Sequence, residues 1–340
     1  MSTFPQKKID IVGIGASTLD RFIVVEHYPT GREVQQVVSS TTDGGGPVAT
    51  ALAVAGKYGV RTAMIDSIGD DMVGRHILDD FKKYNVNTDA IHIETGEKSG
   101  VATILVKHST GERAVFFERS TAKEPAFLEV HKELIKNAFI LHINGRHRQF
   151  MRSAMAIAKE VGTIISLDGG AQRYDEDMKP ITEDSHIVIV ARDYAEKYTG
   201  STNLEDACRI IHDRGALIAG VTDGANGSYF VWPDGTAYRC EPFPQKSIVD
   251  TTGAGDSFHG AFLASLVNTI HYMNGQENTF IIKPDSTYIN AVDVLKHCAH
   301  SDLEKAAIFA SAVASLNTQG IGGRSPLPTL KVVHELTGWE

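Results

Sequence analysis

One glycine-rich segment carries an acidic residue at each end: Asp250-Thr251-Thr252-Gly253-Ala254-Gly255-Asp256. Apolar residues follow it at helical spacing, which predicts that an amphipathic helix begins inside the segment: Phe258, Phe262, Leu263 and Leu266. Backbone N–H groups at a helix N-terminus lack intrahelical partners and, together with the helix dipole, attract anions. We therefore predict that a phosphoryl group binds against the amides of Gly253, Ala254 and Gly255.

A carboxylate in the first turn of this helix has two interpretations. Asp256 is either a helix cap that the dipole stabilises, or a general base that takes a hydroxyl proton while the amides hold a migrating phosphoryl group. The glycines on both sides of Ala254 favour the second interpretation, because a simple cap does not need them. The segment is not a Walker A loop, since the chain contains no G-x-x-x-x-G-K-[ST].

The overall composition is that of a globular protein. The chain has 340 residues, of which 42% are hydrophobic and 22% charged, with a net charge of −9. An acidic balance argues against a nucleic acid or an anionic membrane as partner. Three cysteines that are far apart in the sequence do not predict a disulfide framework. We expect no secretory signal peptide, because no apolar segment follows Lys7 and Lys8, and no membrane span, because no apolar run is long enough. We expect a cytoplasmic protein.

Short β-branched runs alternate with helix-length amphipathic stretches along most of the chain. The predicted strands are Ile9–Ile14, Ala63–Ile68, Phe139–Ile143, Thr163–Leu167, Ile187–Val190 and Leu217–Thr222. The predicted helices include Pro47–Tyr58, Val73–Tyr84, Gln149–Val161 and Leu204–Arg214. This alternation predicts an α/β fold in which helices cover both faces of a parallel sheet. We expect a single domain over residues 1–340.

Three regions interrupt the alternation. Residues 16–42 and 97–122 contain extended segments with turn residues, which predict antiparallel strands outside the main sheet, in a small β-strand lid. Residues 270–300 are polar and rich in Asn, and they follow a strong helix. We interpret them as a surface insertion.

The Asp250–Asp256 segment resembles the D-T-x-G-A-G-D signature of the PfkB, or ribokinase-like, carbohydrate kinases. Three other segments resemble motifs of this family in the same order along the chain. They are the G-x-x-x-x-D of Gly15–Asp20, the glycine signature of Gly44–Ala51 and the T-x-G-x-x-G of Thr222–Gly227. The resemblance extends from residue 9 to about residue 327.

This resemblance implies an ATP-dependent sugar kinase with Asp256 as catalytic base and an anion hole formed by residues 253–255. The sugar would bind at Asp20, Gly45, Gly46 and Thr50. ATP would bind at Thr222, Gly224, Gly227, Thr252 and Asn317, with Mg²⁺ neutralising its phosphates. In some relatives a monovalent cation such as K⁺ binds near the positions of Asp250 and Thr252. The lid would close over the sugar, and in several members it also forms a homodimer interface.

Two departures from the family pattern affect these expectations. Many members carry N-x-x-E after one strand, a motif linked to magnesium and phosphate handling, and the corresponding stretch here is Ala191-Arg192-Asp193-Tyr194. The contacts of magnesium with the protein are therefore left open. Thr50 stands where ribokinase-like members often have a sugar-binding Asn, so ribose is not the expected substrate.

Weaker likenesses point to a ketohexose. Residues 111–120 and 141–146 are similar to ketohexokinase, whereas Gly322-Gly323-Arg324 is more similar to bacterial sulfofructose kinases. Arg146 lies close in sequence to Arg148 and Arg152, and a guanidinium in the cleft would bind a sulfonate or phosphate on the sugar. The alternative for Arg146 is a solvated basic helix start. Other functions left open are a sulfosugar, sugar-phosphate or nucleoside kinase, and a non-catalytic sugar or nucleotide sensor.

Overall fold

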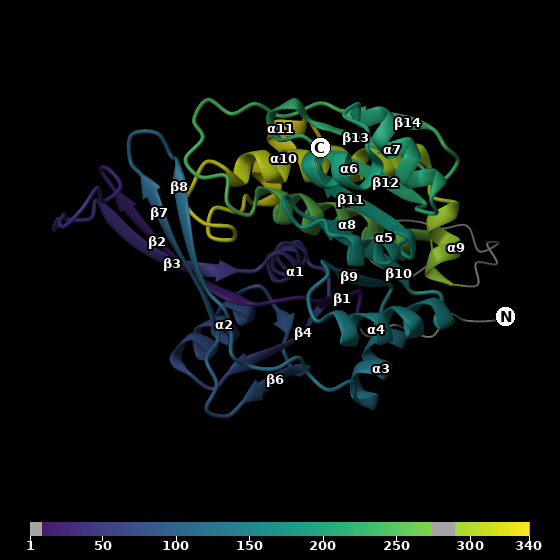
Figure 1. Ribbon diagram of the computed structural model, residues 1–340. Coiled ribbons are helices and arrows are strands. Elements are labelled where there is room, and N and C mark those ends of the chain that lie inside the picture. Colours follow the sequence, from purple (N-terminus) through teal and green to yellow (C-terminus); the bar gives the residue numbers. More distant parts are fainter. Residues whose placement is uncertain (1–8, 274–289, 340) are drawn as a thin grey trace.

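The core of the protein is a ten-stranded, mainly parallel sheet (Figure 1). The computed structural model describes residues 9–273 and 290–339. The strands are β1 (Ile11–Ile14), β4 (Thr62–Gly69), β5 (Val86–Asn87), β6 (Ile91–Glu94), β9 (Ile140–Ile143), β10 (Ile164–Gly169), β11 (Ile187–Ala191), β12 (Ile218–Thr222), β13 (Ser228–Val231) and β14 (Ala237–Cys240). Their order is β14-β13-β12-β11-β10-β9-β1-β4-β5, with β6 paired to β4. Among the described strands of this sheet, β12–β13 and β13–β14 are antiparallel pairs, and the other pairs are parallel.

Helices cover both faces of this sheet, as the sequence predicts. One face is covered by α1 (Pro47–Lys57), α2 (Met72–Lys83), α8 (Ala254–Met273), α9 (Ala291–Lys296), α10 (His300–Asn317) and α11 (Leu330–Thr337). The other is covered by α3 (Glu129–Lys136), α4 (Arg148–Val161), α5 (Lys179–Glu183), α6 (Arg192–Thr199) and α7 (Leu204–Asp213). Each predicted strand and helix is confirmed to within two residues at its ends.

Burial on both faces explains why the central strands are continuous apolar runs. Residues 187–190, Ile-Val-Ile-Val, are 0% exposed, and their side chains alternate between the two hydrophobic clusters. A parallel strand inside such a sheet has no solvent face for polar residues. The carboxyl ends of the parallel strands consequently meet at one edge, where polar residues can be placed.

A second, four-stranded sheet projects from the body and forms the lid (Figure 1). Its strands are β2 (Thr18–Val25), β3 (Ser39–Gly45), β7 (Gly100–Lys107) and β8 (Arg113–Glu118), in the order β3-β2-β7-β8. The outer pairs are antiparallel, as predicted, but β2 and β7 pair in parallel, which the sequence analysis did not anticipate. The β2–β3 hairpin and the β7–β8 hairpin enter the lid from different parts of the body, and this determines that β2 and β7 run in the same direction.

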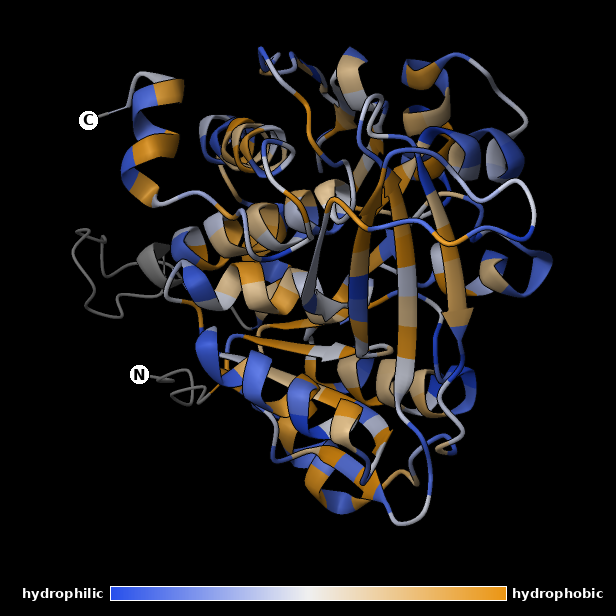
Figure 2. Cartoon of the chain, turned by 90° about the vertical axis from the view of Figure 1, so that its left-hand side faces the viewer, coloured by the Kyte–Doolittle hydropathy of each residue, from blue (hydrophilic) through white to orange (hydrophobic). Residues whose placement is uncertain are grey.

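The inner face of the lid has its own small core. Phe22, Val24, Ala102, Ile104 and Val106 are buried there, and Ile321 from the C-terminal part of the chain packs against them. In Figure 2 the lid faces the viewer and shows hydrophobic residues along its strands. The lid is therefore held to the body by apolar packing as well as by its connections.

The prediction of a surface insertion over residues 270–300 is wrong for residues 291–296. Residues 274–289 lie outside the described residues, but residues 291–296 form α9. Ala291, Val294 and Leu295 are at most 1% exposed and belong to the main hydrophobic cluster. Their i, i+3, i+4 spacing presents one apolar face to the core, a short pattern that the surrounding polar residues obscured.

No helix in the described ranges combines the length and the apolar character that crossing a bilayer requires.

Candidate active site at the carboxyl edge of the sheet

The glycine-rich segment forms a tight turn into α8. Gly253 has a φ of 71°, and a Cβ on it would lie 2.6 Å from the Cα of Gly323, so no other residue fits this position without a shift. The helix begins at Ala254, and Asp256 lies in its first turn, as predicted. Gly255 is exposed, and a Cβ there would meet no atom within 4 Å. Open space therefore adjoins the amides at the start of α8, which suits a bound anion.

Two buried polar residues, Asn317 and Asp250, hold this turn in place by hydrogen bonds. The amide of Asn317, at the end of α10, donates to Ser257 Oγ and to the carbonyl of Gly323, both at 3.1 Å. Asp250 accepts from the Gly322 N–H at 3.0 Å and from the Thr252 N–H at 2.9 Å. Asn317 is 1% exposed, so its side chain stabilises the loop instead of facing the open space.

Asp256 lies among other charged groups at the carboxyl edge. Burial, followed by the negative charge of Asp168, raises the pKa of Asp256 to about 6. Asp20 adds to this effect, whereas Arg173 and His259 oppose it. A carboxylate with a raised pKa that is still ionised at neutral pH is well suited to accept a proton.

A buried polar cluster lies behind Asp256. Asp168, in β10, is 3.3 Å from Nε2 of His259, which is one turn beyond Asp256 in α8. Burial opposes ionisation of Asp168, but the charge of His259 and its hydrogen bond keep the pKa of Asp168 below its ordinary value. His142, in β9, contacts Ser166 at 3.2 Å, and burial keeps the pKa of His142 well below 6.5. Sequence analysis did not single out Asp168, although it follows a predicted strand directly.

The predicted sugar residues lie together at the base of the lid. Asp20, in β2, accepts a hydrogen bond from Thr18 Oγ1 at 2.8 Å, and burial raises the pKa of Asp20 to about 6. A Cβ on Gly45 would lie 2.0 Å from Oδ1 of Asp20, so the carboxylate packs directly on this glycine. Gly46 precedes α1 with a φ of 92°. Thr50, in α1, is buried, and its hydroxyl accepts a hydrogen bond from Arg324.

Three of the five predicted nucleotide residues, Thr222, Gly224 and Gly227, lie at or just after the end of β12, whereas Thr252 precedes α8 and Asn317 ends α10. Thr222 is the last residue of this strand, and its hydroxyl is 3.5 Å from the carbonyl of Val190. Gly224 begins a short 3-10 turn and Gly227 follows it, with φ values of 52° and 84°. A Cβ on Gly227 would lie 2.3 Å from the carbonyl of Cys240, which explains the requirement for glycine there.

The arginines near β9 have different surroundings. Arg148 forms ion pairs with Asp175 and Asp177, so it is a structural surface residue. Arg146 is exposed after β9, and in the described ranges its side chain has no ion pair. None of its contacts connects it with Asp256 or Asp20, so the structure does not bring it into the cluster.

Sequence analysis missed an arginine from the lid. Arg113, the first residue of β8, donates to Thr252 Oγ1 at 2.6 Å and lies 3.6 Å from Asp250 Oδ1. Its guanidinium occupies the position beside Asp250 and Thr252 where the resemblance implies a monovalent cation. Two cations repel each other there, so these residues do not fit K⁺ in this conformation, and we derive no role for it. The contact also connects the lid with the anion-binding turn.

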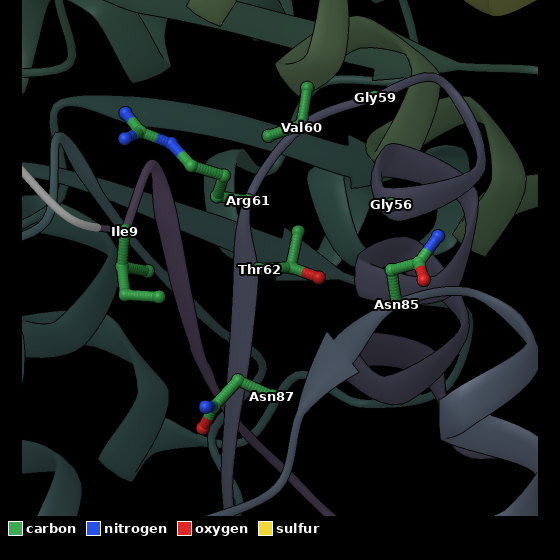
Figure 3. A pocket seen from close by; sticks show the side chains of 8 residues that line it. All are labelled: Ile9, Gly56, Gly59, Val60, Arg61, Thr62, Asn85 and Asn87. Carbon is green, nitrogen blue, oxygen red and sulfur yellow. The ribbon is translucent and has the colours of Figure 1, made fainter.

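The pocket shown in Figure 3 lies elsewhere. It is lined by Arg61, Thr62, Asn85 and Asn87, among others, at the amino ends of β1 and β4. The candidate site lies at the carboxyl ends of the parallel strands. This pocket is therefore not part of the candidate site.

Comparisons with known proteins identify the family of the chain. The family description "pfkB family carbohydrate kinase" matches residues 8–330. Probable fructokinase-5 of Arabidopsis thaliana is 32% identical over 241 residues, which cover 66% of this chain and 73% of that protein.

Solved structures share the fold. A putative ribokinase from Agrobacterium tumefaciens superimposes with a TM-score of 0.78 at 21% identity, covering 97% of this chain and 98% of that one. A putative ribokinase II from E. coli, in complex with ATP and Mg²⁺, gives a TM-score of 0.76 at 17% identity, covering 97% and 99%. With the family match over nearly its whole length, the chain belongs to the pfkB family of carbohydrate kinases, phosphotransferases whose acceptor is an alcohol group.

Proposed function

We propose that this kinase transfers the γ-phosphoryl group of ATP to a hydroxyl of a ketohexose. One observation carries the mechanism: Asp256 lies in the first turn of α8, beside the amides of residues 253–255 and within electrostatic reach of Asp20. In this proposal Asp256 accepts the hydroxyl proton and the amides stabilise the charge on the phosphoryl group. Asp20, Gly45 and Thr50 bind the sugar. The similarity to a fructokinase supports a ketose.

ATP would bind along Thr222, Gly224 and Gly227, with its phosphates directed toward the start of α8. Magnesium neutralises the phosphate charge when it is bound. In the stretch that departs from N-x-x-E, the Tyr194 hydroxyl is 2.7 Å from Thr182 Oγ1 and Asp193 accepts a hydrogen bond from the Gln172 N–H, so both polar groups already have partners in the protein. We infer that phosphate oxygens and water provide the ligands of magnesium.

The test is an assay of ADP release with Mg-ATP against ketohexoses, sulfofructose, sugar phosphates, ribose and nucleosides. We expect turnover with a ketohexose that follows saturation kinetics. Preference for sulfofructose or a sugar phosphate would instead indicate that Arg146, which has no ion pair in the described residues, reaches the substrate. No turnover by a folded, ATP-binding chain would favour a sensor.

Activity is expected to fall as the pH drops through about 6. The pKa values of Asp256 and Asp20 are both raised to about 6 by burial, and both carboxylates act in ionised form in this mechanism. A pH profile of kcat/KM would show this acid limb; a flat profile down to pH 5 would contradict the assignments.

The free energy of unfolding should change with pH in the opposite direction to the activity, so that it decreases as the pH rises. Folded-state pKa values above the ordinary 3.8 mean that the folded chain binds more protons between about pH 4 and pH 6. The contribution of these groups to stability is therefore lost as pH rises through this window.

We also propose a homodimer through the outer face of the lid. Phe116 of β8 is paired with Thr103 of β7, and Thr103 is paired with Arg21 of β2, so these three residues lie on one face of the lid together with Ile23. Phe116 is 60% exposed. Light scattering is expected to give twice the 36.9 kDa chain mass. Phe116→Asp is expected to give monomers, whereas Leu128→Asp, at the equally exposed start of α3, should leave the dimer intact. A monomeric wild type would refute this.

A further inference from the structure

Arg324 is a fully buried arginine beside the proposed sugar site. It is 1% exposed, and its guanidinium donates three hydrogen bonds. Nη1 donates to Asp80 at 2.6 Å, Nη2 to the carbonyl of Gly45 at 2.8 Å, and Nε to Thr50 Oγ1 at 3.2 Å. The guanidinium also lies over the ring of Phe81, 5.2 Å from its centroid. Its partners thus come from α2, the end of β3 and α1.

The backbone at Arg324 is fixed as well. Asp43 accepts hydrogen bonds from the N–H groups of Arg324 and Ser325, both at 2.9 Å. A Cβ on Gly44 would lie 2.1 Å from Arg324 Nη1, so this glycine allows the guanidinium to approach β3. The adjoining Gly322 and Gly323 contact the anion-binding turn at Asp250 and Gly253. One short loop therefore joins the proposed sugar and phosphate sites.

A buried guanidinium is expensive to desolvate unless each of its donors is partnered. An apolar side chain could fill the same space, so packing alone does not explain why a guanidinium with three hydrogen-bond donors is placed here. Two of the three acceptors, Gly45 and Thr50, belong to the proposed sugar site. The hydroxyl of Thr50 accepts from Arg324 and, among the described residues, has no acceptor for its own proton.

We propose that Arg324 is a positioning residue that orients the Thr50 hydroxyl as a hydrogen-bond donor to the sugar and holds Gly45 in place. This inference rests on the proposed function. It predicts that Thr50 recognises an acceptor oxygen of the sugar, while the carboxylate of Asp20 recognises hydroxyl donors. Arg324 does not touch the substrate and acts through these two residues.

The experiment compares the variants Arg324→Lys, Thr50→Val, Thr50→Ser and the double variant Arg324→Lys/Thr50→Val. A lysine retains the charge but cannot reach three acceptors in different directions. Arg324→Lys and Thr50→Val are each expected to raise the KM for the sugar roughly tenfold, with the KM for ATP within about twofold of wild type. Thr50→Ser, which retains the hydroxyl, should restore sugar binding. The KM of the double variant for the sugar should be no higher than that of the more impaired single variant, because both changes remove the same interaction.

Arg61→Lys is the control. Arg61 also donates two side-chain hydrogen bonds to the buried carboxylate of Asp10, at 3.0 and 2.6 Å, although its own side chain is 42% exposed. It lies at the amino end of β4, whereas the candidate site lies at the carboxyl ends of the parallel strands. Arg61→Lys should lower thermal stability and leave the KM for the sugar unchanged. If Arg324→Lys behaves like Arg61→Lys, Arg324 is only structural and the inference is wrong.

Sugar binding without turnover separates this inference from the proposed function. If the wild-type chain turns over no sugar, the proposed function fails, and the affinity for the ketohexose, measured by calorimetry without ATP, decides the inference. A roughly tenfold weaker affinity in Arg324→Lys and Thr50→Val, but not in Thr50→Ser or Arg61→Lys, would support the positioning role. Unchanged affinity in Arg324→Lys, or no binding by the wild type, would overturn it.

Discussion

Asp256→Asn is expected to lower kcat by about 10²- to 10⁴-fold, the range typical of a positioned acid or base. The substitution keeps the shape of the side chain but removes the proposed proton acceptor at the start of α8. ADP release at saturating ATP and sugar measures the effect. We expect the KM for ATP to change much less than kcat, because three of the predicted nucleotide contacts, Thr222, Gly224 and Gly227, lie away from α8 at the end of β12.

Thermal unfolding supplies the control for Asp256→Asn. The charge on Asp256 is opposed by burial and by Asp168, so a neutral side chain should leave the melting temperature equal or higher at pH 7. Loss of activity in a more stable protein cannot be ascribed to unfolding. Turnover within threefold of wild type would exclude Asp256 as the base.

Gly255→Ala is expected to lower turnover without lowering the stability of the folded chain. A Cβ at this position meets no atom within 4 Å, and Ala is the better helix former, so the folded chain should be at least as stable as wild type. The added methyl group projects into the open space where we place the phosphoryl group. We expect a loss of turnover of about 10²- to 10³-fold, comparable to the removal of an oxyanion-hole donor.

Gly31→Ala is the control for this methyl group. Gly31 also has no atom within 4 Å of a Cβ, and it lies in the exposed segment between β2 and β3. Its substitution should affect neither melting temperature nor turnover. Full activity in Gly255→Ala would mean that no phosphoryl group approaches this side of α8.

The sequence predicted those parts of the site that local patterns encode. The turn into α8 is specified by consecutive residues, because glycines and helical spacing occur within one short segment. The strands were equally clear, since burial on both faces makes each of them a continuous apolar run.

Contacts between distant segments could not be predicted in this way. Arg324 bonds to Asp80 and Gly45, 244 and 279 residues earlier. Nothing near Arg324 in the sequence indicates a buried charge. The parallel pairing of β2 with β7 and the contact between Arg113 and Thr252 likewise depend on how the lid returns to the body.

The loop that carries Arg324 also determines when the site can form during synthesis. Asp20, Gly45 and Asp256 leave the ribosome before residues 320–325. This loop nevertheless contacts the proposed sugar site through the side chain of Arg324 and the anion-binding turn through the N–H of Gly322. A nascent chain in which Arg324 is still inside the ribosome therefore contains the residues of the proposed site, but the loop that connects its sugar and phosphate parts is not yet in place. Phosphoryl transfer should begin only after this late loop has docked.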